Sequence, residues 1–257
     1  MSLGRRLFSQ VNKMNTDNLP KLDEKGLRRM KRREWMKLLP LAAMGAFAFP
    51  GVNEKLIKRG LEFSDFAAEK FFRRQRLAPV FSDREVTAFE KFPINSYSDY
   101  DPEAELENWK LIVEGMVARP GEYSLAQIKA LPKQVQNVKH ICVEGWNVIG
   151  NFGGVRLADF LQFIGADSQA KFVEMSCMDD YFTSYDLASA LHPQTLLCYE
   201  MYGQPLTKDH GAPLRIHTPV KLGYKSAKHL FSLRVSNVLR SEKGFWEDQG
   251  YSWYGGV

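Results

Sequence analysis

The stretch HICVEGWNVIGNFGGVRLADFL covers residues 140–161 and changes character along its length. Residues 135–146 alternate apolar and polar side chains, which predicts a strand that runs into a glycine-rich loop at 150–154. Residues 155–164 carry apolar residues at helical spacing and predict a helix. Short strands and short helices in no strict alternation favour an α+β fold over a doubly wound parallel sheet.

The same pattern continues on both sides of this stretch. Ser124 is suited to cap a short helix at 125–128, and Pro132 ends it. A second short helix is expected at 187–191, and further strands at 109–115, 171–177, 213–219 and 230–238. From about residue 77 the pattern is therefore mixed α and β, without internal repeats, and residues 77–257 are expected to be α+β.

Positive charge is concentrated at the start of the chain. The 257 residues carry a formal net charge of +5, yet residues 1–76 hold 18 Lys and Arg against 8 Asp and Glu, and residues 77–257 hold 17 against 22. The larger part is thus mildly acidic and has no basic stripe with interleaved aromatics, which argues against a nucleic-acid partner. Three Cys and a hydrophobic content of 44% exclude a disulfide scaffold and a mainly disordered chain.

Residues 1–48 have the order of a twin-arginine export signal. The pair Arg32-Arg33 is followed by an aromatic residue, a lysine and the apolar run 38–49, which is too short to span a bilayer. The alternative is a basic tail that ends in a core helix. We expect a periplasmic protein, with residues 49–76 as a linker or membrane-proximal helix and membrane association if the signal is not cleaved.

Two stretches gather side chains that carry chemistry. Cys142 stands near the end of a strand, two residues after His140. His210 and Arg215 lie on Gly- and Pro-bearing turns that lead to residues 226–228, Ser-Ala-Lys. A guanidinium and an ammonium suit a phosphate or another oxyanion. A thiolate that nearby cations keep deprotonated suits a soft or high-valent metal. Together they indicate a cofactor with an anionic tail and a metal end.

The sequence resembles the sulfite oxidase-type molybdopterin oxidoreductases, in the small bacterial exported branch that includes periplasmic protein-methionine-sulfoxide reductase catalytic subunits. The resemblance covers essentially residues 90–257. Its matching segments, in the family's order, are 140–161, FVEMSCMDDYFTS (172–184), LHPQTLLCYEMYGQPL (191–206), HGAPLRIHTPVKLGYKSAKHL (210–230) and GFWEDQGYSWYGGV (244–257).

The resemblance implies a single mixed, strand-rich α+β domain over residues 77–257 that holds one molybdenum–molybdopterin per chain. It also assigns roles to individual residues. Cys142 is the expected thiolate ligand of molybdenum, and His140 and Tyr181 are expected beside it in the catalytic pocket. The expected cofactor contacts are Asn95, His140, Ser176, His210, Arg215, Ser226, Ala227 and Lys228. Cys177 and Cys198 are expected to be small buried hydrophobes, and Lys228 is favoured over Lys225 as a functional residue.

The residues after Cys142 depart from those of animal and plant sulfite oxidases, which place an Arg-containing segment there. Here Glu144 follows, and it would repel sulfite if it faced the metal. We expect oxygen-atom transfer to or from a small sulfoxide, N-oxide or sulfite-like substrate, with electrons exchanged with a separate partner, a membrane b-type cytochrome. The alternative is a non-catalytic exported module that holds a pterin or an anion.

Overall fold

The computed structural model describes residues 59–60, 63, 76–98, 100–101 and 106–257. The expected export signal and most of the expected linker lie outside these residues. Within them, no helix has the length and apolar character that a membrane crossing requires. The described residues belong to one compact unit, residues 58–257.

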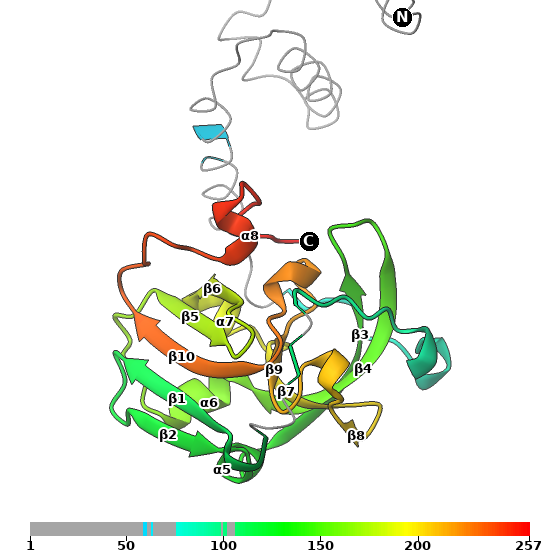
Figure 1. Cartoon of the computed structure of the whole chain (residues 1–257), viewed down its shortest axis with the longest axis horizontal. Coiled ribbons are helices and arrows are strands. Elements are labelled where there is room, and N and C mark those ends of the chain that lie inside the picture. The colour runs from blue at the N-terminus through cyan, green and yellow to red at the C-terminus, as the bar shows by residue number, and fades with distance from the viewer. Residues whose placement is uncertain (1–58, 61–62, 64–75, 99, 102–105) are drawn as a thin grey trace, which may run out of the picture. The chain divides into compact units, whose positions relative to one another are not determined.

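The first of two sheets has the strand order β2-β1-β10-β5-β6 (Figure 1). Only β1 and β10 are parallel to each other, and the other neighbours are antiparallel. Its strands are β1 (Lys110–Gly115), β2 (Gly121–Ser124), β5 (Phe172–Cys177), β6 (Phe182–Asp186) and β10 (Leu230–Ser236).

The second sheet has the order β3-β4-β7-β8, and β9 also pairs with β7. Every pairing in it is antiparallel. Its strands are β3 (Lys133–Ile141), β4 (Asn147–Arg156), β7 (Leu196–Met201), β8 (Gln204–Pro205) and β9 (Arg215–His217). One mixed sheet and one antiparallel sheet with few helices confirm the predicted α+β class.

The helices are short. In α5 (Leu125–Lys129) the Ser124 side chain accepts from the Gln127 N–H while Gln127 reaches back to Ser124, so the predicted cap is confirmed as a capping box. The other α-helices within residues 106–257 are α6 (Leu157–Phe163), α7 (Leu187–Ala190) and α8 (Phe245–Asp248). One-turn 3₁₀ segments are η2 (Asp83–Glu85), η3 (Phe89–Lys91), η4 (Leu106–Asn108), η5 (Lys208–His210) and η6 (Gly223–Lys225).

The predicted glycine-rich loop at 150–154 is wrong, because these residues continue strand β4. A Cβ on Gly153 would lie 2.3 Å from Glu200 Oε1, and a Cβ on Gly154 would lie 2.1 Å from the Leu197 carbonyl oxygen. The glycines therefore let β4 approach β7 closely, at a register shift between the two residues. These glycines are thus explained by the close packing of two strands and not by a loop.

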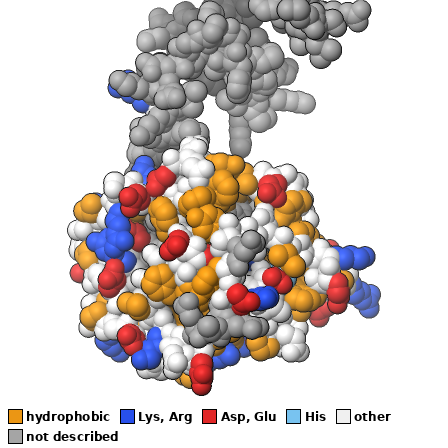
Figure 2. Space-filling view, in the orientation of Figure 1, with side chains coloured by type: hydrophobic (Ala, Val, Ile, Leu, Met, Phe, Trp, Pro, Cys, Tyr) orange, Lys and Arg blue, Asp and Glu red, His pale blue; other side chains and the backbone are white. Residues whose placement is uncertain are grey.

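Two apolar clusters hold the sheets together. The larger packs α5 and α6 against the first sheet and includes Leu111, Phe160 and Leu233. The smaller contains Phe92, Phe152 and Cys198, next to β3, β4 and β7. On the face shown in Figure 2, Lys, Arg, Asp and Glu side chains lie interspersed among apolar ones. Four of the buried polar side chains, those of His140, His210, Arg215 and Ser226, lie together at one cavity.

Candidate active site

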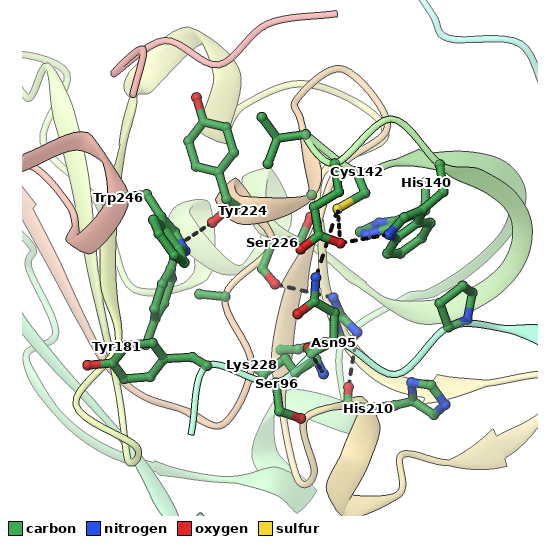
Figure 3. Close-up of a pocket in the computed structure, with 18 of the residues that line it drawn as sticks. Asn95, Ser96, His140, Cys142, Tyr181, His210, Tyr224, Ser226, Lys228 and Trp246 are labelled. Atoms are coloured by element: carbon green, nitrogen blue, oxygen red, sulfur yellow. Dashed lines mark hydrogen bonds between the residues drawn. The ribbon is translucent and has the colours of Figure 1, made fainter. Parts of the chain in front are cut away.

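One cavity of about 180 Å³ collects nine of the ten residues that the sequence singled out. Figure 3 shows the arrangement, with Cys142 and His140 on one side and Tyr181 and Trp246 on the other. The predicted residues that line it are Asn95, His140, Cys142, Tyr181, His210, Arg215, Ser226, Ala227 and Lys228. Segments far apart in the chain thus meet at one site.

Cys142 follows β3 directly and begins a tight turn. Its N–H donates to the Trp146 carbonyl (2.9 Å), and its own carbonyl accepts from the Gly145 N–H (3.1 Å). The residue is 7% exposed. Its Sγ lies 3.9 Å from the Asn95 amide nitrogen, which donates to it, and 3.8 Å from Glu144 Oε2. The turn thus fixes a single thiol at the cavity wall between an amide and a carboxylate.

The electrostatics of this thiol differ from the sequence expectation. Burial raises the pKa of Cys142, and the negative charge of Glu144 raises it further. The expectation that nearby cations keep the thiolate deprotonated is therefore wrong for the polypeptide alone. A bound metal ion would itself deprotonate a coordinating thiol.

Arg215 forms the centre of a cationic cradle in β9. It is 3% exposed, and its guanidinium donates to the carbonyls of His210 (3.1 Å) and Ser226 (3.2 Å). Its Nε and the Ser226 Oγ are buried without a hydrogen-bond partner among the described residues. An unsatisfied buried donor costs about 1–3 kcal/mol, so these two atoms indicate a ligand with acceptor oxygens.

Lys228 links the cradle to the thiol. Its Nζ donates to the backbone carbonyls of Asn95 (2.7 Å) and Asp209 (2.5 Å), and the Asn95 side chain reaches Cys142. Burial lowers the pKa of Lys228 to about 7, and the charge of Arg215 acts in the same direction. An ammonium with a depressed pKa gains from an anionic ligand, since the ligand restores its charged form.

The two predicted histidines of the site are neutral. Burial lowers the pKa of His140 to about 3 and that of His210 to about 4, with Arg215 the second cause in both. The His210 ring packs edge-on against Phe92 at 5.4 Å between centroids. The His140 ring lies 5.6 Å from that of His217. Both imidazoles therefore serve as uncharged walls of the cavity.

The opposite wall is aromatic. The Tyr181 hydroxyl donates to the Tyr224 carbonyl (2.5 Å), and burial raises the pKa of this phenol. Trp246 of α8 and Tyr251 also line the cavity. The hydroxyl of Tyr181 is thus occupied by the backbone of the loop that carries the cradle, which makes the residue a support of the site.

Ser176 is the one predicted contact that the structure does not bring to this cavity. It lies in β5 and lines a second cavity with Glu174 and Arg240. The neighbouring Cys177 lines that second cavity too. The contact that the resemblance implied for Ser176 is therefore not found at the cavity that holds Cys142.

Two lining residues of chemical interest were not predicted as functional. Glu144 faces the cavity, because its Oε2 accepts from Trp146 Nε1 (3.0 Å) and lies beside the Cys142 thiol. Its position two residues after Cys142 in a tight turn was a usable signal. Trp246 arrives from the end of the chain, and nothing local in the sequence places it here.

A two-sheet α+β domain with a single thiol and a cationic cradle in one cavity defines a protein that holds an anionic, metal-bearing cofactor. Residues 99–246 match the family of the oxidoreductase molybdopterin binding domain, and the chain belongs to this family. It is an oxidoreductase of the sulfite oxidase-like type.

Curated relatives agree with this family. A protein of Azospira oryzae with the provisional name protein-methionine-sulfoxide reductase subunit YedZ1 is 42% identical over 187 residues, which cover 72% of this chain and 70% of that protein. The uncharacterized oxidoreductase YuiH of Bacillus subtilis is 32% identical and covers 62% and 80%. The protein-methionine-sulfoxide reductase catalytic subunit MsrP of Xanthomonas campestris is 30% identical and covers 66% and 59%.

The residues present fit a molybdopterin. The unsatisfied Arg215 Nε and Ser226 Oγ offer donors to oxyanion oxygens, and Lys228 adds a charge. Cys142 offers a soft sulfur ligand in the same cavity. The family and the donor set thus point to the same cofactor.

Proposed function

We propose that this chain reduces a small sulfoxide by oxygen-atom transfer, with a molybdenum–molybdopterin held in the cavity. The observation that carries the proposal is the pair of unsatisfied donors, Arg215 Nε and Ser226 Oγ, in the cavity that also holds the Cys142 thiol. The names of two relatives, which describe protein-methionine-sulfoxide reductases, support the choice of substrate class.

Each residue has a distinct part in this proposal. The cofactor, when bound, supplies the metal that exchanges an oxygen atom and electrons with the substrate. Cys142 binds the metal through its sulfur, and Asn95 holds that sulfur with an amide donor. Arg215, Ser226 and Lys228 bind the anionic tail of the pterin. The neutral imidazoles of His140 and His210 both pack against Phe92 and form an uncharged part of the cavity wall.

Glu144 sets the charge preference for the substrate. Its carboxylate oxygen lies 3.8 Å from the Cys142 sulfur and would repel an anion that approaches the metal. A neutral sulfoxide avoids this repulsion, whereas sulfite does not. The aromatic wall of Tyr181, Trp246 and Tyr251 suits the apolar groups and the sulfur of such a substrate.

The test compares wild type with Cys142→Ser, using a reduced artificial electron donor and a panel of sulfoxides, N-oxides and sulfite. We expect sulfoxide turnover in the wild type, and loss of both molybdenum and turnover in the variant. The matched control is Cys198→Ser, because Cys198 is also buried but lies outside the cavity, with its sulfur on the Glu200 carbonyl. A folded wild type that binds molybdenum but turns over no substrate would favour the non-catalytic module.

We also propose export to the periplasm by the twin-arginine route and electron delivery by a separate membrane b-type cytochrome. The order of the Arg pair, lysine and apolar run in residues 31–49 supports export. Replacing Arg32 and Arg33 by Lys should leave the protein in the cytoplasm, as followed by cell fractionation. Unchanged export of that variant would refute the route, and a pulldown that contains no haem protein would count against the cytochrome.

A further inference from the structure

Two tyrosine hydroxyls donate hydrogen bonds to the backbone of the cradle loop, defined here as residues 223–228. The Tyr181 hydroxyl donates to the Tyr224 carbonyl (2.5 Å), and the Tyr185 hydroxyl donates to the Lys225 carbonyl (2.6 Å). Ser226 and Lys228 of the same loop line the cofactor cavity. The position of the loop backbone therefore decides where the cradle groups lie.

Lys225 ties this loop to the end of the chain through a buried ion pair. Its Nζ contacts the Glu247 carboxylate of α8, and the two side chains are 0% and 1% exposed. Figure 1 shows α8 as a separate short helix near the C-terminus. Neither charge can reach water, so each depends on the other for compensation.

The Glu247 carboxylate is fixed from several directions. Its Oε1 also accepts from the Thr183 hydroxyl (2.8 Å), and a Cβ on Gly244 would lie 2.1 Å from its Oε2. That second oxygen has no hydrogen-bond partner among the described residues. A carboxylate held this closely has little freedom to follow Lys225 if the loop moves.

The C-terminal segment also accepts hydrogen bonds from this loop and from the residue before it. The Tyr224 hydroxyl donates to the Ser252 carbonyl (2.6 Å), and the Leu222 N–H donates to the Gly255 carbonyl (2.8 Å). Next to Glu247, Trp246 lines the cavity itself. The C-terminal segment thus contacts the cradle loop and also contributes to the aromatic wall of the cavity.

We propose that Glu247 is a positioning residue of the cofactor site, which acts through Lys225 on the cradle loop. Glu247 does not line the cavity, so it has no contact of its own with a bound group. Neutralising it leaves the Lys225 ammonium buried without compensation, and the loop backbone shifts as that charge moves toward water. The cradle donors then leave their places and the cofactor is released more easily. This inference rests on the proposed cofactor site.

The test is Glu247→Gln in the full chain purified with its cofactor. We expect the rate of molybdenum and pterin loss to rise about tenfold or more, as for other residues that orient the groups holding a metal. The control is Glu174→Gln, which removes an 11%-exposed carboxylate from its pair with Arg234 in the first sheet, away from the cavity. Equal loss rates for the two variants, or wild-type retention in Glu247→Gln, would overturn the proposal.

Two further measurements separate positioning from general stability. The double variant Lys225→Met with Glu247→Met removes both charges, and we expect it to retain the cofactor better than Glu247→Gln. Hydrogen exchange on wild type, with and without cofactor, needs no variant. Reciprocal coupling predicts slower exchange of the α8 amides in the loaded protein, and unchanged exchange would contradict the proposal. Wild type free of molybdenum would instead refute the proposed function.

Discussion

Residues 215–228 contain four cations, of which Arg215, Lys221 and Lys225 are buried and Lys228 is half-buried. They are of two kinds. Lys221 and Lys225 each pair with a buried carboxylate, Asp186 and Glu247 respectively. Arg215 and Lys228 form no ion pair in the described part of the chain and donate instead to backbone carbonyls. The two paired lysines lie between Arg215 and Lys228 in the sequence, yet only Arg215 and Lys228 line the cavity.

This difference distinguishes cations that stabilise the fold from cations that bind a ligand. A buried charge that has its counter-charge in the protein is complete, and removing the partner costs stability. A buried cation held only by carbonyl dipoles keeps part of its field free for an external anion. We therefore assign the paired lysines to stabilisation of the fold. Arg215 and Lys228, which form no ion pair in the described part of the chain, are assigned to cofactor binding.

The largest effect on the stability of the fold is expected from Lys225→Met. The variant leaves Glu247 buried without a partner, and we expect the folded state to lose about 3–5 kcal/mol. Urea unfolding of the cofactor-free protein measures this directly. A loss below about 1 kcal/mol, the range of a surface ion pair, would show that the pair is not structural.

Arg215→Gln should weaken cofactor binding strongly and change the stability of the fold little. Removing charge-assisted hydrogen bonds to a ligand costs about 1.5–3 kcal/mol of binding, which corresponds to roughly a 10- to 100-fold weaker cofactor affinity. The stability of the cofactor-free protein should change by only about 1 kcal/mol, since an uncompensated charge is lost along with two hydrogen bonds. Metal content and urea unfolding are measured together. A variant with normal cofactor content and strong destabilisation would place Arg215 with the scaffold.

The smallest expected effect is a pH dependence from Lys228. Its pKa is lowered to about 7, so the ammonium is present below that pH and is lost as the pH rises through it. Sulfate, whose charge is constant in this range, should bind the cofactor-free protein about tenfold more weakly at pH 8 than at pH 6. Calorimetric titration measures the affinity, and Lys228→Gln should abolish the dependence. Equal affinities at both pH values in wild type would contradict it.

The sequence predicted the site better than the strands around it. Cys142, Arg215 and Lys228 were predicted from their residue types and from the family resemblance, and the structure brings all three to one cavity. Ser176 was assigned from the resemblance alone, and the structure places it with Cys177 at a second cavity. Trp246 and Glu247 could not be foreseen as parts of the site, since α8 reaches it only through tertiary packing.

In the fold, too, some elements could be predicted from the sequence and others depend on tertiary packing. The α5 cap could be predicted because Ser124 and Gln127 satisfy each other locally. Strand β4 was misread, because the space that Gly153 and Gly154 leave is filled by residues of β7, far along the chain. Local rules therefore predict local elements, and close approach between strands appears only in three dimensions.

The central claim is that the unpaired cations of the cavity, with Cys142, hold one molybdopterin. The most direct test measures molybdenum and pterin in the full-length wild-type protein, purified from cells supplied with molybdate. We predict close to one of each per folded chain, with both strongly reduced in Arg215→Gln. A folded wild type that carries neither would contradict the account.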